Sequence, residues 1–294
     1  MILSDFFDMK VQDESFHHPI LLEKQIELNI RRLDRLHLHA GGNKIFKLQN
    51  WLHEIEKYES IISFGGAFSN HLLALSAVAK MLKVKSIGII RGEKPAVLNH
   101  YLTAFVENGM ELIFVSRTKY KNKTEQEFND ELHSNFPKSL VIPEGGAGEN
   151  GISGAMKMVN EIEPYDLIVL PCATGTTLAG IALKNKNCKI IGFQVLKGEG
   201  GIQNELMKSA KLDVLSLPNL IINDSYHFGG YAKVSNELIN FQKDIFLKTK
   251  IPLDKVYGIK AMYGLLEEIK AGKIKVNSKI LYIHTGGTFD FINQ

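Results

Sequence analysis

Two lysines follow a Gly-Gly-Asn turn in the stretch AGGNKIFKLQ, residues 40–49. After this turn, apolar residues recur at spacings of three and four as far as Ile55, which predicts a helix with Lys44 and Lys47 in its first turn. The helix dipole disfavours cations at that end. Because only an unprotonated amine attacks a carbonyl, a lysine in a positive field suits Schiff-base chemistry. Lys44 and Lys47 are therefore the first candidates for a reactive site.

Two glycine-rich turns, each after an apolar strand pattern, could bind anions. In SFGGAFSNH (63–71), Ser69 and Asn70 open an apolar helix, so they either only cap it or bind a carboxylate or phosphate there. In ATGTTLAG (173–180), threonine hydroxyls flank Gly175, which suits a phosphate. This second turn lacks the G-x-x-x-x-G-K-[ST] pattern of nucleoside-triphosphate loops. Both turns are predicted to hold parts of a ligand.

A third glycine-rich motif leaves two interpretations open. EGGAGENG (144–151) matches the G-x-G-x-x-G spacing of dinucleotide sites, with Glu163 or Asp166 as the ribose acid. Glu149 and Asn150, however, do not begin a clear helix. An ordinary glycine turn is the alternative.

Histidines and tyrosines elsewhere are weaker candidates. His37 and His39 share a face of RLHLHA and could bind a metal, but no third ligand is evident, so a surface or core pair is the alternative. Tyr226, Tyr231 and Tyr257 lie near turns, where a tyrosine either donates a proton or belongs to the core. No metal site is expected.

The composition is that of a globular protein without a polyanionic partner. The 294 residues are 45% hydrophobic and 23% charged, with a net charge of +3. The chain has no basic run interleaved with aromatics, no apolar stretch that could span a bilayer and no secretory signal in MILSDFFDMK. Two cysteines make neither a disulfide framework nor a metal cluster. We expect a cytoplasmic protein that binds neither nucleic acid nor membranes.

Short apolar runs alternate with helix-length segments along most of the chain. Such runs are typical of parallel strands buried on both faces, so the expected fold class is α/β, with mostly parallel sheets flanked by helices. Ligands of such sheets bind where strands end, which is where the glycine-rich turns lie. The polar segment 117–135 is interpreted as a solvated face or surface loop. The expected strands are 60–64, 85–90, 110–115, 139–143, 166–171, 189–196 and 279–285, and the expected helices include 70–82 and 98–109.

A phosphate cradle, a second anion site and a reactive lysine together indicate one chemistry. The phosphate would belong to a cofactor, the carboxylate to an amino-acid substrate, and the lysine would form the Schiff base. This combination is that of pyridoxal 5'-phosphate (PLP) enzymes, in which the cofactor is the electron sink.

Four motifs in this order, GGNKIFKL, SFGGAFSNH, ATGTTLAG and ILYIHTGG, resemble the 1-aminocyclopropane-1-carboxylate deaminase / D-cysteine desulfhydrase family. The resemblance covers most of the chain and implies a fold type II PLP enzyme with the two-domain tryptophan-synthase-β-like architecture. It implies a large PLP-binding domain (1–47 and 151–294), a smaller inserted α/β domain (48–150) and the cofactor between them. It also implies a small amino-acid substrate and a homodimer.

Positions that match the family's motifs receive roles from this resemblance. Lys44 matches the Schiff-base lysine, and Lys47 looks like a phosphate or field partner. Ser69 matches an active-site serine that also binds substrate, Asn70 a residue that contacts substrate and the cofactor ring, and His71 a substrate-binding position. The phosphate loop is matched by Thr174, Gly175, Thr176 and Thr177, and the active-site tyrosines are matched by Tyr257 and, less closely, by Tyr231.

Three positions favour D-cysteine desulfhydrase activity, which gives pyruvate, ammonia and sulfide. Gly258 stands where similar deaminases carry a glutamate for the pyridine nitrogen, and Thr285, a candidate cofactor contact, stands where they carry leucine. His71 also follows the desulfhydrase pattern. A neutral hydroxyl makes the ring a weaker electron sink than a carboxylate does. The alternatives are 1-aminocyclopropane-1-carboxylate deaminase, which gives 2-oxobutyrate and ammonia, β-elimination from another D-amino acid, and a non-catalytic nucleotide or amino-acid binding protein.

The chain also departs from the family's pattern. Phe46 stands between the two lysines, where an arginine is usual, and RLHLHA replaces a longer polar segment before the Gly-Gly-Asn turn. These departures bear on the substrate more than on the cofactor.

Overall fold

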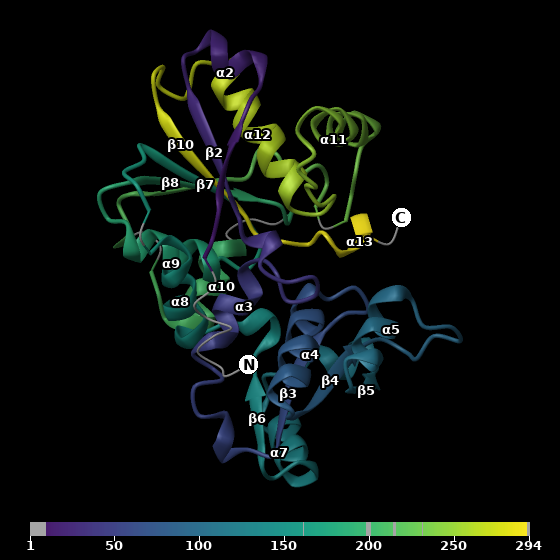
Figure 1. The fold of residues 1–294 in the computed structure, drawn as a ribbon. Coiled ribbons are helices and arrows are strands. Elements are labelled where there is room, and N and C mark those ends of the chain that lie inside the picture. Colours follow the sequence, from purple (N-terminus) through teal and green to yellow (C-terminus); the bar gives the residue numbers. More distant parts are fainter. Residues whose placement is uncertain (1–9, 161, 198–200, 214–215, 231, 293–294) are drawn as a thin grey trace.

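The protein contains two β-sheets with helices between and around them, as a computed structural model shows (Figure 1). The model describes residues 10–160, 162–197, 201–213, 216–230 and 232–292. No helix in these ranges is both long enough and apolar enough to cross a membrane.

The larger sheet combines strands from both ends of the chain. Its strand order is β1, β2, β10, β7, β8, β9, and all neighbours are parallel except β1 and β2. Because β10 pairs with both β2 and β7, it joins the first and last parts of the chain in one sheet. The strands are β1 (Asp13–Phe16), β2 (Glu27–Arg32), β7 (Leu167–Cys172), β8 (Lys189–Gln194), β9 (Leu220–Asn223) and β10 (Lys279–His284).

The smaller sheet has four parallel strands from the middle of the chain, in the order β5, β4, β3, β6. Helices connect its strands, as parallel pairing requires. The division into domains at residues 47/48 and 150/151 stays a prediction. The elements are β3 (Ser60–Gly65), α4 (Asn70–Leu82), β4 (Lys85–Arg91), α5 (His100–Glu107), β5 (Met110–Val115), α6 (Arg117–Lys121), α7 (Gln126–Asn135) and β6 (Ser139–Ile142).

Three hydrophobic clusters hold the layers together. One face of the larger sheet packs against α2 (Pro19–Glu23), α11 (Asn236–Thr249) and α12 (Gly258–Lys270). Its other face belongs to a cluster that continues through α4 and α5 onto the smaller sheet, while α6 and α7 cover that sheet's outer face. The middle cluster also contains α3 (Asn43–Gln49), α8 (Glu149–Met156), α9 (Thr176–Lys184) and α10 (Gly201–Ala210).

The predicted α/β class with mostly parallel sheets is confirmed. Each of the expected strands, and the expected helices 70–82 and 98–109, is present with ends within two residues of those expected. The sequence did not reveal β1, β2 and β9. In β2 the cause is charge, because Arg31 and Arg32 are buried in the strand and conceal its apolar pattern.

Two local predictions were wrong and a third was incomplete. The helix after the Gly-Gly-Asn turn ends at Gln49, and the later apolar residues remain buried in turns and a short 3₁₀ helix (Ile55–Lys57). Segment 117–135 presents a largely exposed face, as interpreted, but its backbone forms α6 and α7, because Tyr120, Phe128 and Leu132 bury against the sheet. Glu149 does begin a helix, α8.

Candidate active site

A cavity of about 720 Å³ lies where strand ends from the two sheets face each other. Its lining residues follow β3, β4 and β6 of the smaller sheet and β7, β8 and β10 of the larger one. Small-molecule sites typically measure about 300–1,000 Å³. Tyr231 lies outside the described residues. The predicted site residues that line the cavity are Lys44, Lys47, Ser69, Asn70, His71, Thr174, Gly175, Thr177, Tyr257 and Thr285.

The Gly-Gly-Asn and Thr-Gly-Gly turns touch through their backbones. A Cβ on Gly42, whose φ is +97°, would lie 2.3 Å from the Thr285 carbonyl oxygen, so a side chain cannot fit there. Asn43 N–H donates to that same oxygen at 3.0 Å. The Asn43 side chain donates to Thr177 Oγ1 at 2.9 Å. Three motifs far apart in sequence therefore form one continuous wall.

Lys44 and Lys47 place two amines without counter-charges in this cavity. Neither Nζ forms a hydrogen bond or ion pair with any residue that the structure describes, and Lys47 is only 1% exposed. Burial lowers the pKa of Lys44 to about 8. Burial, together with nearby Lys44, lowers the pKa of Lys47 well below its usual value. Desolvation is the main cause of the lowered pKa of Lys44. The predicted dipole field contributes less, because α3 has only seven residues.

The start of α9 forms an open anion cradle beside these amines. Gly175, at φ +78°, precedes the helix and supplies no side-chain cap, which leaves the first N–H groups unpaired by a cap. Thr174 and Thr177 line the cavity here. Thr176 is buried outside the lining, and its Oγ1 has no hydrogen-bond partner among the described residues. The predicted role of Thr176 in phosphate binding stays a prediction.

The opposite wall begins at the start of α4. Ser69 caps this helix by accepting from Leu72 N–H at 3.2 Å, so the capping interpretation holds. Tyr101 donates to Asn70 Oδ1 at 3.1 Å, which leaves the Asn70 amide nitrogen as a donor. Both side chains line the cavity and can still donate hydrogen bonds to a ligand.

The hydrogen bonds of His71 fix its tautomer. Ser63 donates its hydroxyl proton to Ile142 O at 2.8 Å, so His71 Nε2, 2.8 Å from Ser63 Oγ, must be the donor in that contact. Nδ1 is then an acceptor, and it has no partner among the described residues. Burial and the two lysines lower the pKa of His71 well below its usual value. A neutral acceptor suits an amine better than the carboxylate predicted for this side chain.

Asp254, which the sequence analysis missed, is a buried carboxylate at the cavity wall. Its Oδ1 accepts from the N–H groups of Val256 (2.9 Å) and Tyr257 (2.7 Å), and Oδ2 accepts from Gly258 N–H (2.7 Å). These bonds cap α12 and place Tyr257 on the lining. Burial raises the pKa of Asp254. An aspartate three residues before a tyrosine that opens a helix was the available sequence signal.

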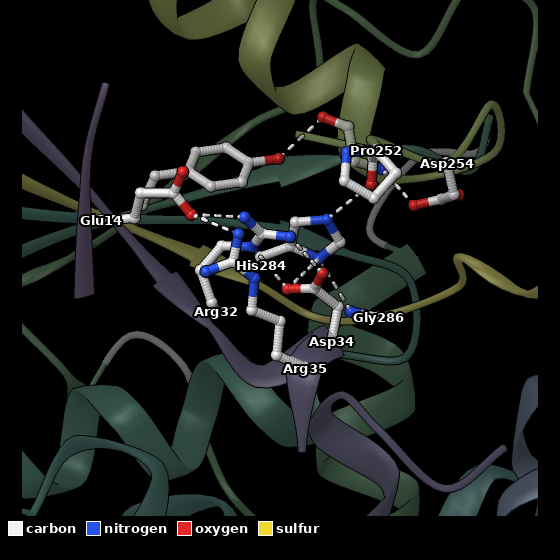
Figure 2. Close-up of polar contacts among 10 residues, drawn as sticks. Glu14, Arg32, Asp34, Arg35, Pro252, Asp254, His284 and Gly286 are labelled. Carbon is white, nitrogen blue, oxygen red and sulfur yellow. Dashed lines mark hydrogen bonds and ion pairs between the residues drawn. The ribbon is translucent and has the colours of Figure 1, made fainter. Parts of the chain in front are cut away.

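A buried ion-pair network supports the larger sheet beneath this wall (Figure 2). Arg32 binds both oxygens of Asp34, at 2.9 and 2.7 Å, and also pairs with Glu14. Although burial raises it, the pKa of Asp34 ends below its usual value because Arg32 donates these bonds.

His284 carries this support to the cavity loop. Its Nε2 donates to Pro252 O at 2.7 Å, and its Nδ1 accepts from Gly286 N–H at 3.2 Å (Figure 2). Asp34 lies 3.7 Å from the same Nδ1. His284 therefore holds together the loop that contains Asp254 and the loop that contains Thr285.

The remaining sequence candidates lie elsewhere. His37 Nδ1 accepts from two backbone N–H groups, and the residues that the structure describes contain no metal-binding cluster. Tyr226 donates to Glu268 at 2.8 Å, packs half-buried against the core and lies off the cavity lining. Phe46 is also absent from the lining.

One glycine of the dinucleotide-like motif serves close packing. A Cβ on Gly151 would lie 1.9 Å from Gly146 O within the motif, and one on Gly154, just after the motif, would lie 2.0 Å from Phe46 O of α3. Gly151 therefore lets α8 pack against the turn before it, and Gly154 lets α8 approach α3 closely.

Comparisons with known proteins agree with this geometry. Residues 22–286 match the family model described as "Pyridoxal-phosphate dependent enzyme". A Pyrococcus furiosus protein named "Putative 1-aminocyclopropane-1-carboxylate deaminase" is 31% identical over 282 residues, and the match covers 89% of this chain and 84% of the Pyrococcus protein. The mitochondrial bifunctional D-cysteine desulfhydrase/1-aminocyclopropane-1-carboxylate deaminase of Arabidopsis thaliana is 29% identical, covering 91% and 75%.

A solved structure gives the same result. The crystal structure of an ACC deaminase homologue superimposes with a TM-score of 0.79 at 27% identity, covering 98% of this chain and 93% of that one. The resemblance found in the four sequence motifs is therefore confirmed, and the chain belongs to the pyridoxal-phosphate dependent enzyme family, among the homologues of 1-aminocyclopropane-1-carboxylate deaminase and D-cysteine desulfhydrase.

Proposed function

We propose that the protein is a D-cysteine desulfhydrase, which converts D-cysteine and water to pyruvate, ammonia and sulfide. PLP, the cofactor of its family, supplies an electron sink for the substrate's α-carbon. The observation that carries the choice of substrate is Thr285, whose neutral hydroxyl-bearing side chain lines the cavity.

The residues of the cavity fit the cofactor. Lys44 would hold the cofactor's aldehyde carbon through its amine, whose pKa burial lowers to about 8. The open N–H groups of α9, with Thr174 and Thr177, would bind the phosphate. Lys47 would add a positive charge that finds its counter-ion only when that phosphate is present.

The substrate would lie against the opposite wall. Its carboxylate would accept hydrogen bonds from Ser69, Asn70 and the first N–H groups of α4. Lys44 Nζ or the hydroxyl of Tyr257 would take the α-proton, because both groups line the same cavity. The proposed roles of Tyr231 and the proposed homodimer rest on the resemblance alone.

A neutral partner for the pyridine nitrogen favours thiol elimination over opening of a cyclopropane. Gly258 has no side chain, and both oxygens of Asp254 are already held by backbone N–H groups. The Thr285 hydroxyl is then the remaining candidate at this end of the lining. Expelling a β-thiol after loss of the α-proton requires less electron withdrawal than breaking a cyclopropane ring does.

1-Aminocyclopropane-1-carboxylate deaminase is the second candidate, because the Pyrococcus furiosus relative carries that name. Purified holoenzyme distinguishes the two activities: sulfide release from D- and L-cysteine is measured beside 2-oxobutyrate release from the cyclopropane amino acid. We expect sulfide and pyruvate from D-cysteine at the higher kcat/KM. Faster formation of 2-oxobutyrate would make the protein a deaminase, and a colourless protein that turns over neither substrate would support the non-catalytic alternative.

A further inference from the structure

We propose that Arg91 forms a second anion subsite at the mouth of the cavity, and that, among β-substituted amino acids larger than D-cysteine, the protein prefers those with a negative charge on the β-substituent. This inference rests on the proposed β-elimination and narrows its substrate class.

Arg91 lies at the end of β4, on the substrate wall of the cavity. Its Nη2 is 3.8 Å from the point where a Cβ on Gly66 would stand, so the guanidinium borders the turn that leads to Ser69. The guanidinium carbon lies 5.9 Å from the centre of the Tyr120 ring, a contact that helps to orient it. The charge therefore stands beside the predicted carboxylate site and not in the α9 cradle.

Arg91 has no counter-charge, whereas the carboxylates of the lining have partners. Glu144 pairs with Lys123 at 3.3 Å, and Asp290 pairs with His100 at 2.7 Å. Asp254 accepts three backbone N–H groups, as described above. Arg91 forms no hydrogen bond or ion pair with any described residue. This arrangement leaves an exposed cation without a counter-charge, ready for an anionic ligand.

The geometry of the two walls assigns each negative charge its own place. The cofactor phosphate has the α9 cradle with Lys47, and the substrate α-carboxylate has the start of α4. A guanidinium binds a planar carboxylate or a phosphate through two parallel hydrogen bonds, which is the ligand chemistry that Arg91 offers. Beside D-cysteine, the substrate class therefore includes amino acids whose β-substituent ends in such an anion. Elimination removes the α-proton and breaks the bond from Cβ to the substituent, and one water then releases ammonia and pyruvate.

A matched pair of substrates tests this subsite. S-carboxymethylcysteine and S-(carbamoylmethyl)cysteine have the same shape and leaving-group sulfur, but only the first carries a second carboxylate. With holoenzyme and the preferred enantiomer, kcat/KM for the carboxylate should exceed that for the amide by about tenfold, as one charge-assisted bond pair provides. Arg91→Gln should remove this preference, mainly through the KM of the anionic substrate. Arg91→Lys, which keeps the charge without the planar fork, should retain part of it.

Lys255 provides the control, because it lines the same cavity with an exposed amine. Lys255→Gln should leave the preference intact; an equal loss would show a general field rather than a subsite and would overturn the inference. Equal losses for both substrates in Arg91→Gln would assign Arg91 to the shared α-carboxylate and also overturn it, as would a wild-type enzyme without preference. Sulfide release from D-cysteine by the yellow wild-type enzyme tests the proposed function separately, so the two failures are distinguishable.

Discussion

The two walls of the cavity are built in different ways. The wall from the larger sheet is fixed by backbone contacts, in which Gly42 and Asn43 press against Thr285 and no side chain fits between them. The wall from the smaller sheet begins to open at Gly66, where the nearest atom to an added Cβ is Arg91 Nη2 at 3.8 Å. Gly65, one residue earlier, is still tight against Ser69.

This difference suggests how one fold can keep its cofactor and change its substrate. Backbone contacts hold the proposed cofactor side, so most substitutions there would disturb the wall itself. Side chains at strand ends form the proposed substrate side, where a residue such as Arg91 can be exchanged without moving the backbone.

Alanine substitution of one glycine on each wall tests this contrast. The largest change in stability is expected on the wall from the larger sheet. Gly42→Ala forces a side chain into positive φ and against Thr285 O, so it should lower the free energy of unfolding by roughly 3–5 kcal/mol. Gly66→Ala meets only Arg91 Nη2, at an ordinary contact distance of 3.8 Å, and should change the free energy of unfolding by less than about 0.5 kcal/mol. Denaturant unfolding of the cofactor-free protein measures both, and similar values for the two variants would remove the distinction between the walls.

A second comparison concerns two buried lysines. Lys260, on α12, is fully buried but donates to His227 O at 3.0 Å and to Gly230 O at 2.7 Å, whereas Lys47 has no partner. Lys47→Met should therefore stabilise the cofactor-free protein by roughly 1–3 kcal/mol and weaken PLP binding. Lys260→Met leaves two carbonyls unpaired and should destabilise it by about the same amount.

Thermal unfolding with and without PLP measures these opposite signs. If both variants lost stability without cofactor, Lys47 would be an ordinary structural residue, and its proposed place at the phosphate would lose its physical basis.

The smallest expected effect is a pH dependence of cofactor loading. Burial lowers the pKa of Lys44 to about 8, so the unprotonated fraction of its amine rises with pH and levels off above that value. The rate at which cofactor-free protein takes up PLP should rise about tenfold per pH unit below 8 and flatten above it. Stopped-flow absorbance gives this profile. A rate that kept rising toward pH 10 would mean that Lys44 titrates as an ordinary exposed lysine.

Motif chemistry and apolar runs carried the sequence-based expectations. Apolar runs located all strands except β1, β2 and β9, and the residues singled out near glycine-rich turns, Lys44, Ser69, Thr174 and Thr285, line one cavity. Their roles in that cavity stay predictions. The length of α3 was not predictable, because apolar residues at helical spacing can also be buried by turns and a short 3₁₀ helix, as they are after Gln49.

Contacts between side chains that are far apart in the sequence could not be predicted from sequence patterns either. The tautomer of His71 depends on Ser63 and Ile142 on neighbouring strands, and the unpaired state of Arg91 depends on which carboxylates find other partners. Such features arise from tertiary packing and have no local signature.

The central claim is that Lys44, and not Lys47, carries the cofactor. Borohydride reduction of the PLP-loaded protein, followed by mass spectrometry of its peptides, tests this claim most directly, with Lys44→Ala as the control. We predict that the yellow absorbance disappears on reduction, that the added mass lies on Lys44, and that Lys44→Ala acquires no label. A label on Lys47, or unchanged labelling of Lys44→Ala, would contradict the account.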